Sequence, residues 1–419
     1  MQKSNRLTLY ILIAMFAGAL LGYIVHTQAS PAFIESFSKN IKLLTTVFIR
    51  MVQMIIAPLV FSTLVVGIAK LGDLKAVGRV GGKAMLWFIG ASLISLLLGM
   101  VLVNFFQPGA GFSNAVLDKT EAGKLVSNTQ QFSLQLFVEH IVPRSVIEAM
   151  ATNEILQLVI FSIFFGVAAA SMGDKAKVIV KALDAVSHVI LKMVGYVMNV
   201  APLGVFGAIA AVIASKGLEV FVFYGKYMLY FLIGIATLWV IMLSVGYIIL
   251  RKRLPELLRR IASPLIIAFS TTSSEAVFPK LTEELEKFGC KNKIVSFILP
   301  LGYSFNLDGS MMYMTFASLA IAQANNIHLD IGTQLTMLLV LMLTSKGIAG
   351  VPRASLVIVT ATCAMFNIPP EGIALILPID HFCDMFRTAT NVLGNTLATT
   401  VVSKWENELG PAQEIPDTL

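Results

Sequence analysis

The chain has 419 residues, of which 57% are hydrophobic and 13% are charged, and it carries a formal net charge of +7. Soluble domains contain about 25% charged residues, so this composition excludes a soluble globular protein and predicts an all-α polytopic membrane protein. The basic residues are scattered between apolar stretches, which argues against nucleic-acid binding. Three cysteines without a CxxC pair indicate neither a metal site nor a disulfide framework.

Six apolar stretches before residue 251 are long enough to cross a bilayer, which needs about 20 residues. They occupy residues 7–25, 41–69, 84–106, 132–172, a fifth stretch ending near 213, and 221–250. Lys and Arg residues cluster at the N-terminus, in the segments 70–83 and 175–181, and directly after residue 250. The positive-inside rule places all these clusters in the cytoplasm, together with the polar C-terminus.

After residue 253 the apolar stretches become short and interrupted. Residues 265–268 run into a polar tip at 270–275 and return as charged sequence, and residues 335–343 reach a second tip at 345–353. We interpret both as re-entrant helical hairpins that enter from opposite sides, with tips covered by protein or water. Paired interruptions of this kind indicate an inverted repeat and the binding site of a secondary transporter.

A seventh span begins near Ile294 and is interrupted between Gly302 and Ser310. Its polar residues Asn306 and Asp308, with Ser304 and Ser310 on either side, alternate at a period of two that one helix face cannot collect. We therefore expect an unwound segment that offers side-chain oxygens and backbone carbonyls together. Cation sites in broken membrane helices are built in this way.

The eighth span carries polar residues at helical spacing. Asp380, Asp384, Arg387, Asn391 and Asn395 are four, three, four and four residues apart, so they share one helix face. A charged residue at membrane depth costs about 2.5–3.5 kcal/mol, so this face is expected to line a pocket. The plainer alternative is an Asp384–Arg387 ion pair that only fixes helix packing, with Asp380 as a capping or structural partner.

These residue types suit an acidic ligand. Arg387 offers a planar fork for one carboxylate, Asp384 can hold an ammonium group, and Asn391 with the hairpin tips can hold a second carboxylate. The implied substrate is aspartate or glutamate. An anion that enters against the membrane potential needs accompanying cations, for which Asp308 and Asn306 provide ligands. We expect a transporter and not an enzyme, with no cofactor beyond the coupling ion, H+ or Na+.

Several motifs resemble those of the dicarboxylate/amino acid:cation symporters. They are the Ser-rich tip that ends at Pro279, Asn306-Leu307-Asp308-Gly309, Gly350-Val351-Pro352, Asp384-x-x-Arg387-x-x-x-Asn391, and Gln107-Pro108-Gly109-Ala110-Gly111. The resemblance implies eight spans, two re-entrant hairpins and a homotrimer in the lipid of a bacterial or archaeal plasma membrane. It also implies an elevator, in which a transport domain (84–131 and 219–402) moves against a scaffold (1–83 and 132–218), leaving a cytoplasmic tail at 403–419.

The resemblance assigns roles to individual residues. Arg387 is expected to bind the side-chain carboxylate of the substrate and Asp384 its amine, and Asp384 favours an amino acid because transporters of plain dicarboxylates tend to lack this acid. The implied substrate-binding residues are Arg387, Asp384, Asn391, Thr388, Ser310, Ser273, Ser274, Val351 and Gly350. The implied cation-coupling residues are Asp308, Asn306, Asn395, Ser92 and Glu275, with a sodium ion at Asn306, Asp308 and Asn391.

Some positions depart from the sodium-coupled members of that family. Asn395 stands where they have Asp, and Phe88, Ala91 and Ser92 stand where they have Tyr, Thr and Ser. Glu275 is an additional acid at a tip where Ser is usual. We hypothesise that coupling favours protons over sodium, with Glu275 or Asp308 carrying the proton.

Three alternative functions stay open. The first is a C4-dicarboxylate:cation symporter, which differs from the main interpretation only in its substrate. A more remote one is an intramembrane aspartyl protease, because Asp308 and Asp384 lie on separate spans, although the GxGD motif of such enzymes is absent. The third is an ion channel, in which a pocket for an anion and an amine has no purpose.

Overall fold

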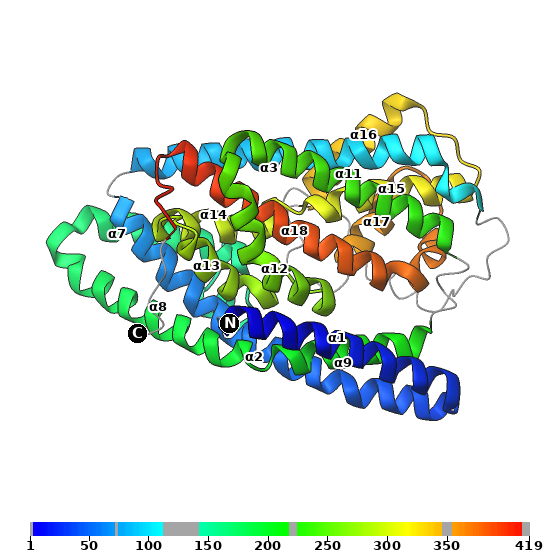
Figure 1. The fold of residues 1–419 in the computed structure, drawn as a ribbon. Helices are drawn as coiled ribbons and strands as arrows, with labels where there is room; N and C mark the ends of the chain where they lie inside the picture. Colours follow the sequence, from blue (N-terminus) through cyan, green and yellow to red (C-terminus); the bar gives the residue numbers. More distant parts are fainter. Residues whose placement is uncertain (1–2, 72–73, 112–141, 218–223, 346–353, 413–419) are drawn as a thin grey trace.

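Long apolar helices dominate the computed structural model, which describes residues 3–71, 74–111, 142–217, 224–345 and 354–412 (Figure 1). The first half of the chain forms α1 (Lys3–Gln28), α2 (Pro31–Leu71), α3 (Leu74–Phe106), α6 (Val146–Ala151), α7 (Ile155–Met172), α8 (Lys177–Met198) and α9 (Ala201–Lys216). The second half forms α11 (Gly225–Leu250), α12 (Leu254–Thr271), α13 (Phe278–Lys287), α14 (Asn292–Phe305), α15 (Asp308–Ala324), α16 (Ile331–Thr344), α17 (Ala354–Met365) and α18 (Leu377–Trp405). Short 3-10 turns are η1 (Pro108–Gly111), η2 (Gly173–Ala176), η3 (Arg251–Arg253), η4 (Glu275–Val277) and η6 (Pro370–Leu375). Among these residues the β-structure amounts to an isolated bridge between Cys290 and Leu409, so the predicted all-α class is confirmed.

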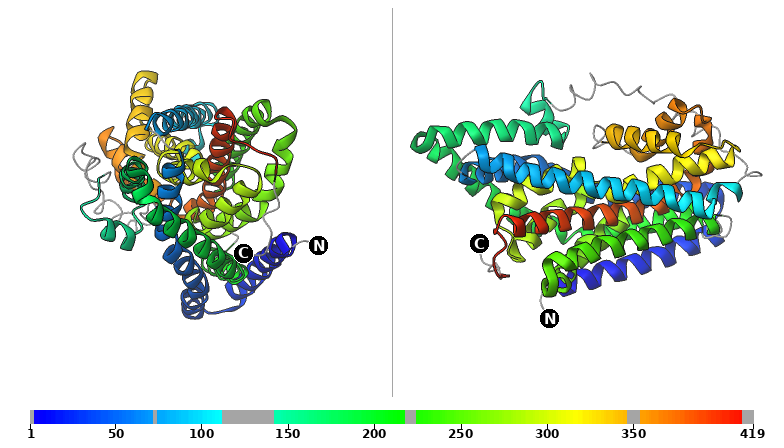
Figure 2. Two further views of the ribbon diagram at one scale, coloured as in Figure 1. Left: turned by 90° about the vertical axis from the view of Figure 1, so that its left-hand side faces the viewer. Right: turned by 90° about the horizontal axis from the view of Figure 1, so that it is seen from above.

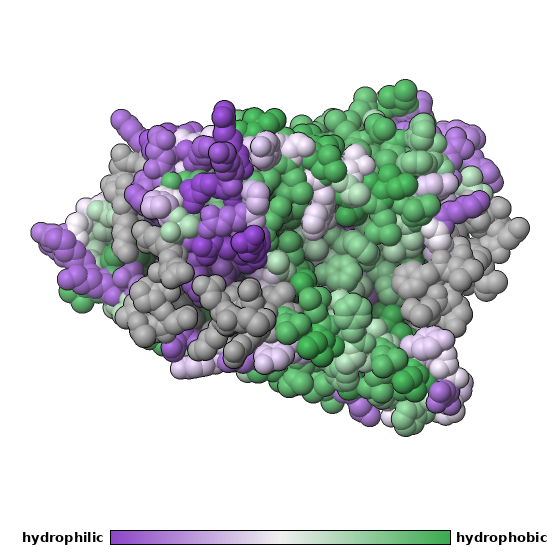
Figure 3. Space-filling model, viewed as in Figure 1, coloured by the Kyte–Doolittle hydropathy of each residue, from purple (hydrophilic) through white to green (hydrophobic). Residues whose placement is uncertain are grey.

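Five stretches of the described residues are long and apolar enough to cross a membrane. They are Leu9–Gln28, Pro31–Ala69, Val77–Phe106, Gln157–Val197 and Gly225–Thr271, and the last two run through consecutive helices. Hydrophobic residues form a broad band across the middle and centre-right of Figure 3, whereas hydrophilic ones gather over the left part of this face and along its right edge. The count of eight spans stays a prediction, because α14 and α15 are separated by a break and α18 carries polar side chains.

Several helix boundaries differ from the sequence prediction, as for α2, which begins at Pro31 and not at residue 41, and two further differences have a clear cause. The basic segment expected as a loop up to residue 83 is helical from Leu74, and its Arg79 and Lys83, four residues apart on one face, both bind Glu406 beyond the end of α18. The fifth apolar stretch is two helices, α8 and α9. Pro202 has no N–H to donate to the carbonyl of residue 198, so the chain starts a new helix there.

The helices form two packing groups. The first packing group consists of α1, α2 and α6–α9, in which α1 and α2 pack along α9 and α2 also packs on α7 and α8. The second packing group consists of α3 and α11–α18, in which α3 lies along α15 while α18 contacts α11, α12, α14 and α15. The groups meet where α14 lies on α2 and where α12 contacts α1 and α9 (Figures 1 and 2).

The two hairpins are described to different extents. In the first, α12 ends at Thr271, the positive φ of 52° at Thr272 breaks the helix, and α13 returns after η4. The interruption predicted at 270–275 is therefore present. In the second, Asp330 caps α16 by accepting a hydrogen bond from the Thr333 amide at 3.2 Å. The predicted tip at 345–353, including Gly350 and Val351, lies outside the described residues except for Ser345.

Candidate functional site

The polar face predicted on α18 is turned into the protein. The side chains of Asp380, Arg387, Asn391 and Asn395 are buried, with 1–5% of their surface exposed, and Asp384 is half-buried. The apolar residues of the opposite face, among them Phe382 and Phe386, line a separate cavity. These side chains are buried in protein because exposing their charge to lipid would be energetically unfavourable.

Arg387 is the centre of an ionic cluster. Its Nη2 donates a hydrogen bond to Oδ1 of Asp380 at 3.1 Å and forms an ion pair with Oδ1 of Asp384 at 2.9 Å. The guanidinium carbon lies 3.9 Å from the centre of the Tyr313 ring on α15, a cation–π distance. The hydroxyl of Tyr313 also donates to Oδ1 of Asp380 at 2.9 Å, so Tyr313 and Asp380 together hold the guanidinium in place.

The guanidinium keeps unused donors. Nε and Nη1 of Arg387 are buried and have no hydrogen-bond partner among the described residues. A buried donor without a partner costs about 1–3 kcal/mol. These two groups point to different edges of the fork, and each of them can donate a hydrogen bond to a carboxylate oxygen. The arrangement is therefore suited to receive an anionic ligand.

Asn391 holds the start of α15. Its Oδ1 accepts hydrogen bonds from the amides of Gly309 at 2.9 Å and Ser310 at 3.2 Å, and its Nδ2 donates to Oγ of Ser310 at 3.0 Å. These amides belong to the first turn of α15 and lack partners within that helix. Asn391 thus acts as an N-cap supplied by another helix, a role that its predicted place in the ligand pocket did not include.

Replacing Asn391 with alanine is expected to lower stability by about 1–2 kcal/mol, because the Gly309 and Ser310 amides then lose their acceptor. The measurement is the apparent Tm of the detergent-solubilised protein. Asn40→Ala on α2 is the control, because the Asn40 side-chain amide donates to Ser36 of α2 on an exposed surface. Equal Tm values for the two variants contradict the capping role.

A second polar cluster fills the break between α14 and α15. Nδ2 of Asn306 donates to Oδ2 of Asp308 at 3.0 Å and to Oδ1 of Asn395 at 3.2 Å, and all three side chains are buried. The cluster combines one carboxylate with amide oxygens. At the break, the backbone carbonyls at the end of α14 have no hydrogen-bond partner within the helix. Hard oxygen ligands with a single negative charge suit a monovalent cation.

The break itself is shorter than predicted. The non-helical residues are Asn306 and Leu307, whereas the whole segment from Gly302 to Ser310 was expected to unwind. Gly302 lies within α14. A glycine is needed there because a Cβ would come within 2.4 Å of Oδ1 of Asn395. Gly394 makes room in the same way, since its Cβ would come within 2.0 Å of Oδ2 of Asp308. These glycines serve close packing, not chain flexibility.

The other predicted residues lie in three places. Ser310 and Thr388 are buried beside the Arg387 cluster along α15 and α18, and Ser92 is buried on α3. At the tip of the first hairpin, Oγ of Ser273 accepts a hydrogen bond from the Ala276 amide at 3.2 Å and Ser274 precedes η4. Glu275 forms a hydrogen bond with Gln53 of α2, so it faces the first packing group.

Tyr313 is the member of the site that the sequence did not predict, whereas Asp380 was expected on the polar face and binds both Arg387 and Tyr313. Tyr313 is three residues after Ser310 and therefore about one turn along the same face of α15, which is the signal that was available.

The two aspartates considered for an aspartyl protease have different partners, because Asp308 pairs with Asn306 and Asp384 pairs with Arg387. These separate pairings give no support to a pair of catalytic aspartates.

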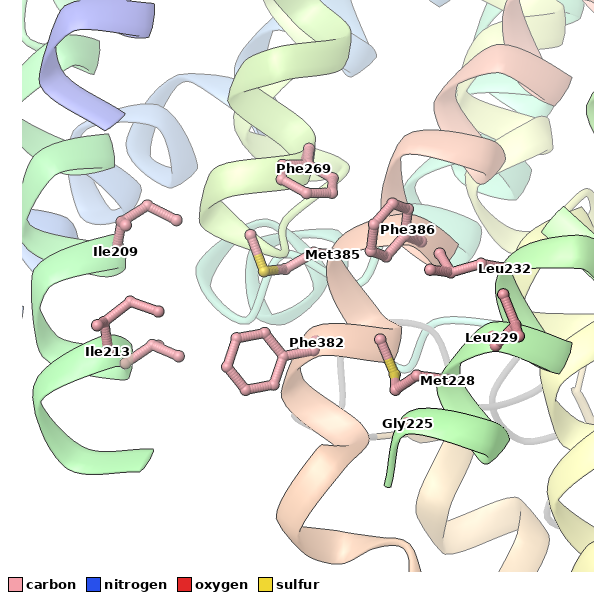
Figure 4. A pocket seen from close by; sticks show the side chains of 11 residues that line it. Ile209, Ile213, Gly225, Met228, Leu229, Leu232, Phe269, Phe382, Met385 and Phe386 are labelled. Atoms are coloured by element: carbon pink, nitrogen blue, oxygen red, sulfur yellow. The ribbon is translucent and has the colours of Figure 1, made fainter. Parts of the chain in front are cut away.

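One cavity near α18 has a different character. It measures about 510 Å³ and lies between Ile209 and Ile213 of α9, Met228 of α11, and Phe269 and Phe382 (Figure 4). All of its lining residues are apolar, so it has no partner for a carboxylate. Among the described residues of α18, the groups suited to an acidic ligand lie on the other face.

Comparison with known proteins supports this chemistry. The sequence pattern of the sodium:dicarboxylate symporter family matches residues 7–405. A C4-dicarboxylate transport protein of Bacillus subtilis is 38% identical over 99% of this chain and 97% of its own length. Proteins of the same name are 41% identical in Rhizobium leguminosarum bv. trifolii and 39% identical in Acinetobacter baylyi, covering 98% and 95% of this chain and 91% of each relative. Together with its long apolar helices, these matches make the chain an integral membrane protein, and the chain belongs to the sodium:dicarboxylate symporter family.

Proposed function

We propose that this protein is a symporter that takes up C4 dicarboxylates together with cations. The relatives are named for C4-dicarboxylate transport, which favours this substrate class over the acidic amino acids expected first from the sequence. The observation that carries the proposal is the buried guanidinium of Arg387, whose Nε and Nη1 have no partner among the described residues. A substrate carboxylate can accept a hydrogen bond from either of these donors.

Aspartate or glutamate is the second candidate, and Asp384 is the reason. Arg387 is in contact with two carboxylates, Asp380 and Asp384, so the cluster has one negative charge in excess. A dianion is repelled by this excess, whereas an α-ammonium group neutralises it. Asp384 is also the more exposed of the two acids, with 29% of its side chain accessible against 5% for Asp380.

Competition in proteoliposomes separates these substrates. Uptake of labelled succinate by the wild type is expected to be inhibited by malate and fumarate at lower concentrations than by aspartate. Inhibition by aspartate at a lower concentration than by unlabelled succinate overturns the proposal in favour of the second candidate.

Asp384→Asn provides the matched variant for the same assay. Removing the excess charge is expected to leave succinate uptake intact or to strengthen it, because a repulsion between like charges is relieved. If the substrate is an amino acid, its affinity instead falls by about tenfold or more, since a charge-assisted hydrogen bond is lost.

We propose the cluster of Asn306, Asp308 and Asn395 as the site of the coupling cation. It contains one carboxylate, that of Asp308, and Asn395 stands where a second acid would strengthen sodium binding. We therefore retain protons as the favoured ion. Uptake driven by a pH gradient without sodium is the expected result. Uptake that requires sodium, with no response to a pH gradient, contradicts proton coupling.

The movement in transport is also a proposal. The packing supports a division into scaffold and transport domain, since α3 and α11–α18 pack on one another and the other helices pack on α2 and α9. We propose that the second packing group moves against the first as an elevator, within a homotrimer.

A further inference from the structure

Residues Glu406–Gly410, which follow α18, are called the C-terminal strap below. The carboxylate of Glu406 lies 2.9 Å from Nη2 of Arg79 and 2.7 Å from Nζ of Lys83, both on the first turns of α3. Nζ of Lys83 also donates to the carbonyl of Trp405 at 3.0 Å. Only 5% of the Glu406 side chain is exposed, against 58% for Arg79, so the carboxylate is enclosed by its partners.

The next residues of the strap pair with the corner between α13 and α14. Glu408 lies 2.7 Å from Nζ of Lys291 and 2.5 Å from Nζ of Lys293. The backbones also pair, because the Lys291 amide donates to the Glu408 carbonyl at 3.2 Å and the Gly410 amide donates to the Gly289 carbonyl at 2.9 Å. This pairing is the isolated bridge between Cys290 and Leu409.

Gly289 is required for this close approach. Its φ is +108°, a conformation that side chains of L-residues rarely adopt. A Cβ at this position would also come within 2.4 Å of the Gly410 carbonyl oxygen. The corner between α13 and α14 is thus shaped to accept the strap.

The strap reaches a third corner, between α11 and α12. Nη1 of Arg253 donates to the Gly410 carbonyl at 2.9 Å, and Nη2 donates to the Phe288 carbonyl at 2.5 Å. The same guanidinium lies 4.4 Å from the centre of the Phe288 ring. One short segment therefore connects the ends of α3, α12, α13 and α14 with α18.

All the helices that the strap connects belong to the second packing group. The chain passes from the first group to the second between α2, which ends at Leu71, and α3, which begins at Leu74. Arg79 and Lys83 lie within the first three turns after this crossing. The strap therefore holds one of the segments of the second group that are directly linked to the first.

We propose that Glu406 and Glu408 are positioning residues for the transport step, which hold the cytoplasmic helix ends of the second packing group together so that the group moves as one body. This inference rests on the proposed function. Rigid elements transmit a displacement, whereas a frayed helix end absorbs it.

The charge state of the two acids supports this role. Partial burial opposes ionisation of Glu406, but hydrogen bonds from Arg79 and Lys83 outweigh it, and the pKa of Glu406 is lowered. The pKa of Glu408 is lowered for the corresponding reason, with Lys291 and Lys293 as the partners. Both carboxylates are therefore charged at neutral pH.

The test is the double variant Glu406→Gln/Glu408→Gln, with Glu256→Gln as its control. Glu256 pairs with Arg260 four residues along the same helix, so its loss removes a carboxylate that joins no second element. The double variant is expected to lower kcat for uptake by about threefold or more while KM changes by less than about twofold. Gly289→Ala is expected to act in the same direction without a change of charge.

Hydrogen exchange provides a readout that does not depend on transport. Amides of residues 74–83 and 286–293 are expected to lose protection in the double variant, while those in the middle of α18 keep it. A kcat equal to that of Glu256→Gln, or unchanged exchange at 74–83, overturns the inference. If the wild type takes up no dicarboxylate or acidic amino acid, the proposed function fails, and the exchange experiment still decides whether the strap fastens α3.

Discussion

Replacing Arg387 with alanine is expected to reduce kcat/KM for uptake by about 100-fold or more, equivalent to roughly 3 kcal/mol. The substrate loses the fork that binds its carboxylate. In addition, Asp380 and Asp384 lose the cation that both of them contact. The cluster then carries two uncompensated negative charges, which oppose the entry of any anion. The measurement is the initial rate of succinate uptake against concentration in proteoliposomes.

Two further variants separate binding from folding. Arg387→Lys keeps the charge but not the planar fork, so uptake is expected to stay about tenfold or more below that of the wild type while the apparent Tm is largely retained. Arg260→Ala, which breaks an ion pair within α12, is expected to behave as the wild type. A KM for Arg387→Lys within about twofold of the wild-type value contradicts the assignment of Arg387 to the substrate.

The inward face of α18 is the part of the site that sequence alone could predict. Five polar residues at helical spacing in an apolar segment have one arrangement that avoids lipid, and that constraint is local to the helix. The first hairpin was predictable for a similar reason, because a polar tip between short apolar arms cannot cross the bilayer. The all-α class followed from composition.

Contacts between helices could not be predicted in this way. Spacing along α18 gives no information about α15, so the placing of Tyr313 beneath Arg387 and its hydrogen bond to Asp380 became visible only in the fold. Asn391 was expected to bind substrate because it shares the polar face of α18. Its cap on α15 was missed because the capped amides lie 82 and 81 positions away in the sequence. The contacts of the C-terminal strap could not be predicted either, because Glu406 and Gly410 belong to a stretch whose sequence indicates only a polar tail.

Glycine was the most misleading signal in the broken span. Gly302 and Gly309 were taken to mark an unwound segment, because glycine tolerates irregular backbone. Both lie in helices, where a Cβ would collide with Asn395 in one case and with the Arg387 carbonyl, at 2.6 Å, in the other. A glycine required for close packing and a glycine required for a turn have the same sequence signature.

The packing of Gly394 leads to the second prediction of a large effect. Replacing Gly394 with alanine is expected to abolish cation-dependent uptake and to lower stability by about 1–3 kcal/mol. The new Cβ would lie 2.0 Å from Oδ2 of Asp308 and 3.1 Å from its Cγ, so the carboxylate must move. Asp308 is fully buried and bonded to Asn306, which leaves the short side chain little room. Displacing the carboxylate removes the single negative charge of the proposed cation site.

The control for this variant is Gly90→Ala on α3, where an added Cβ meets no atom within 4 Å. Alanine stabilises a helix relative to glycine by about 0.5–1 kcal/mol, so this variant is expected to equal or exceed the wild type in Tm. The decisive measurement is uptake rate against pH and against sodium concentration, which reports the cation site, alongside succinate binding, which reports the Arg387 cluster. Because Gly394 lies about two turns beyond Arg387 on α18, retention of succinate binding with loss of the cation response is the expected pattern. A cation response in Gly394→Ala equal to that of Gly90→Ala shows that the coupling ion binds elsewhere than at Asp308.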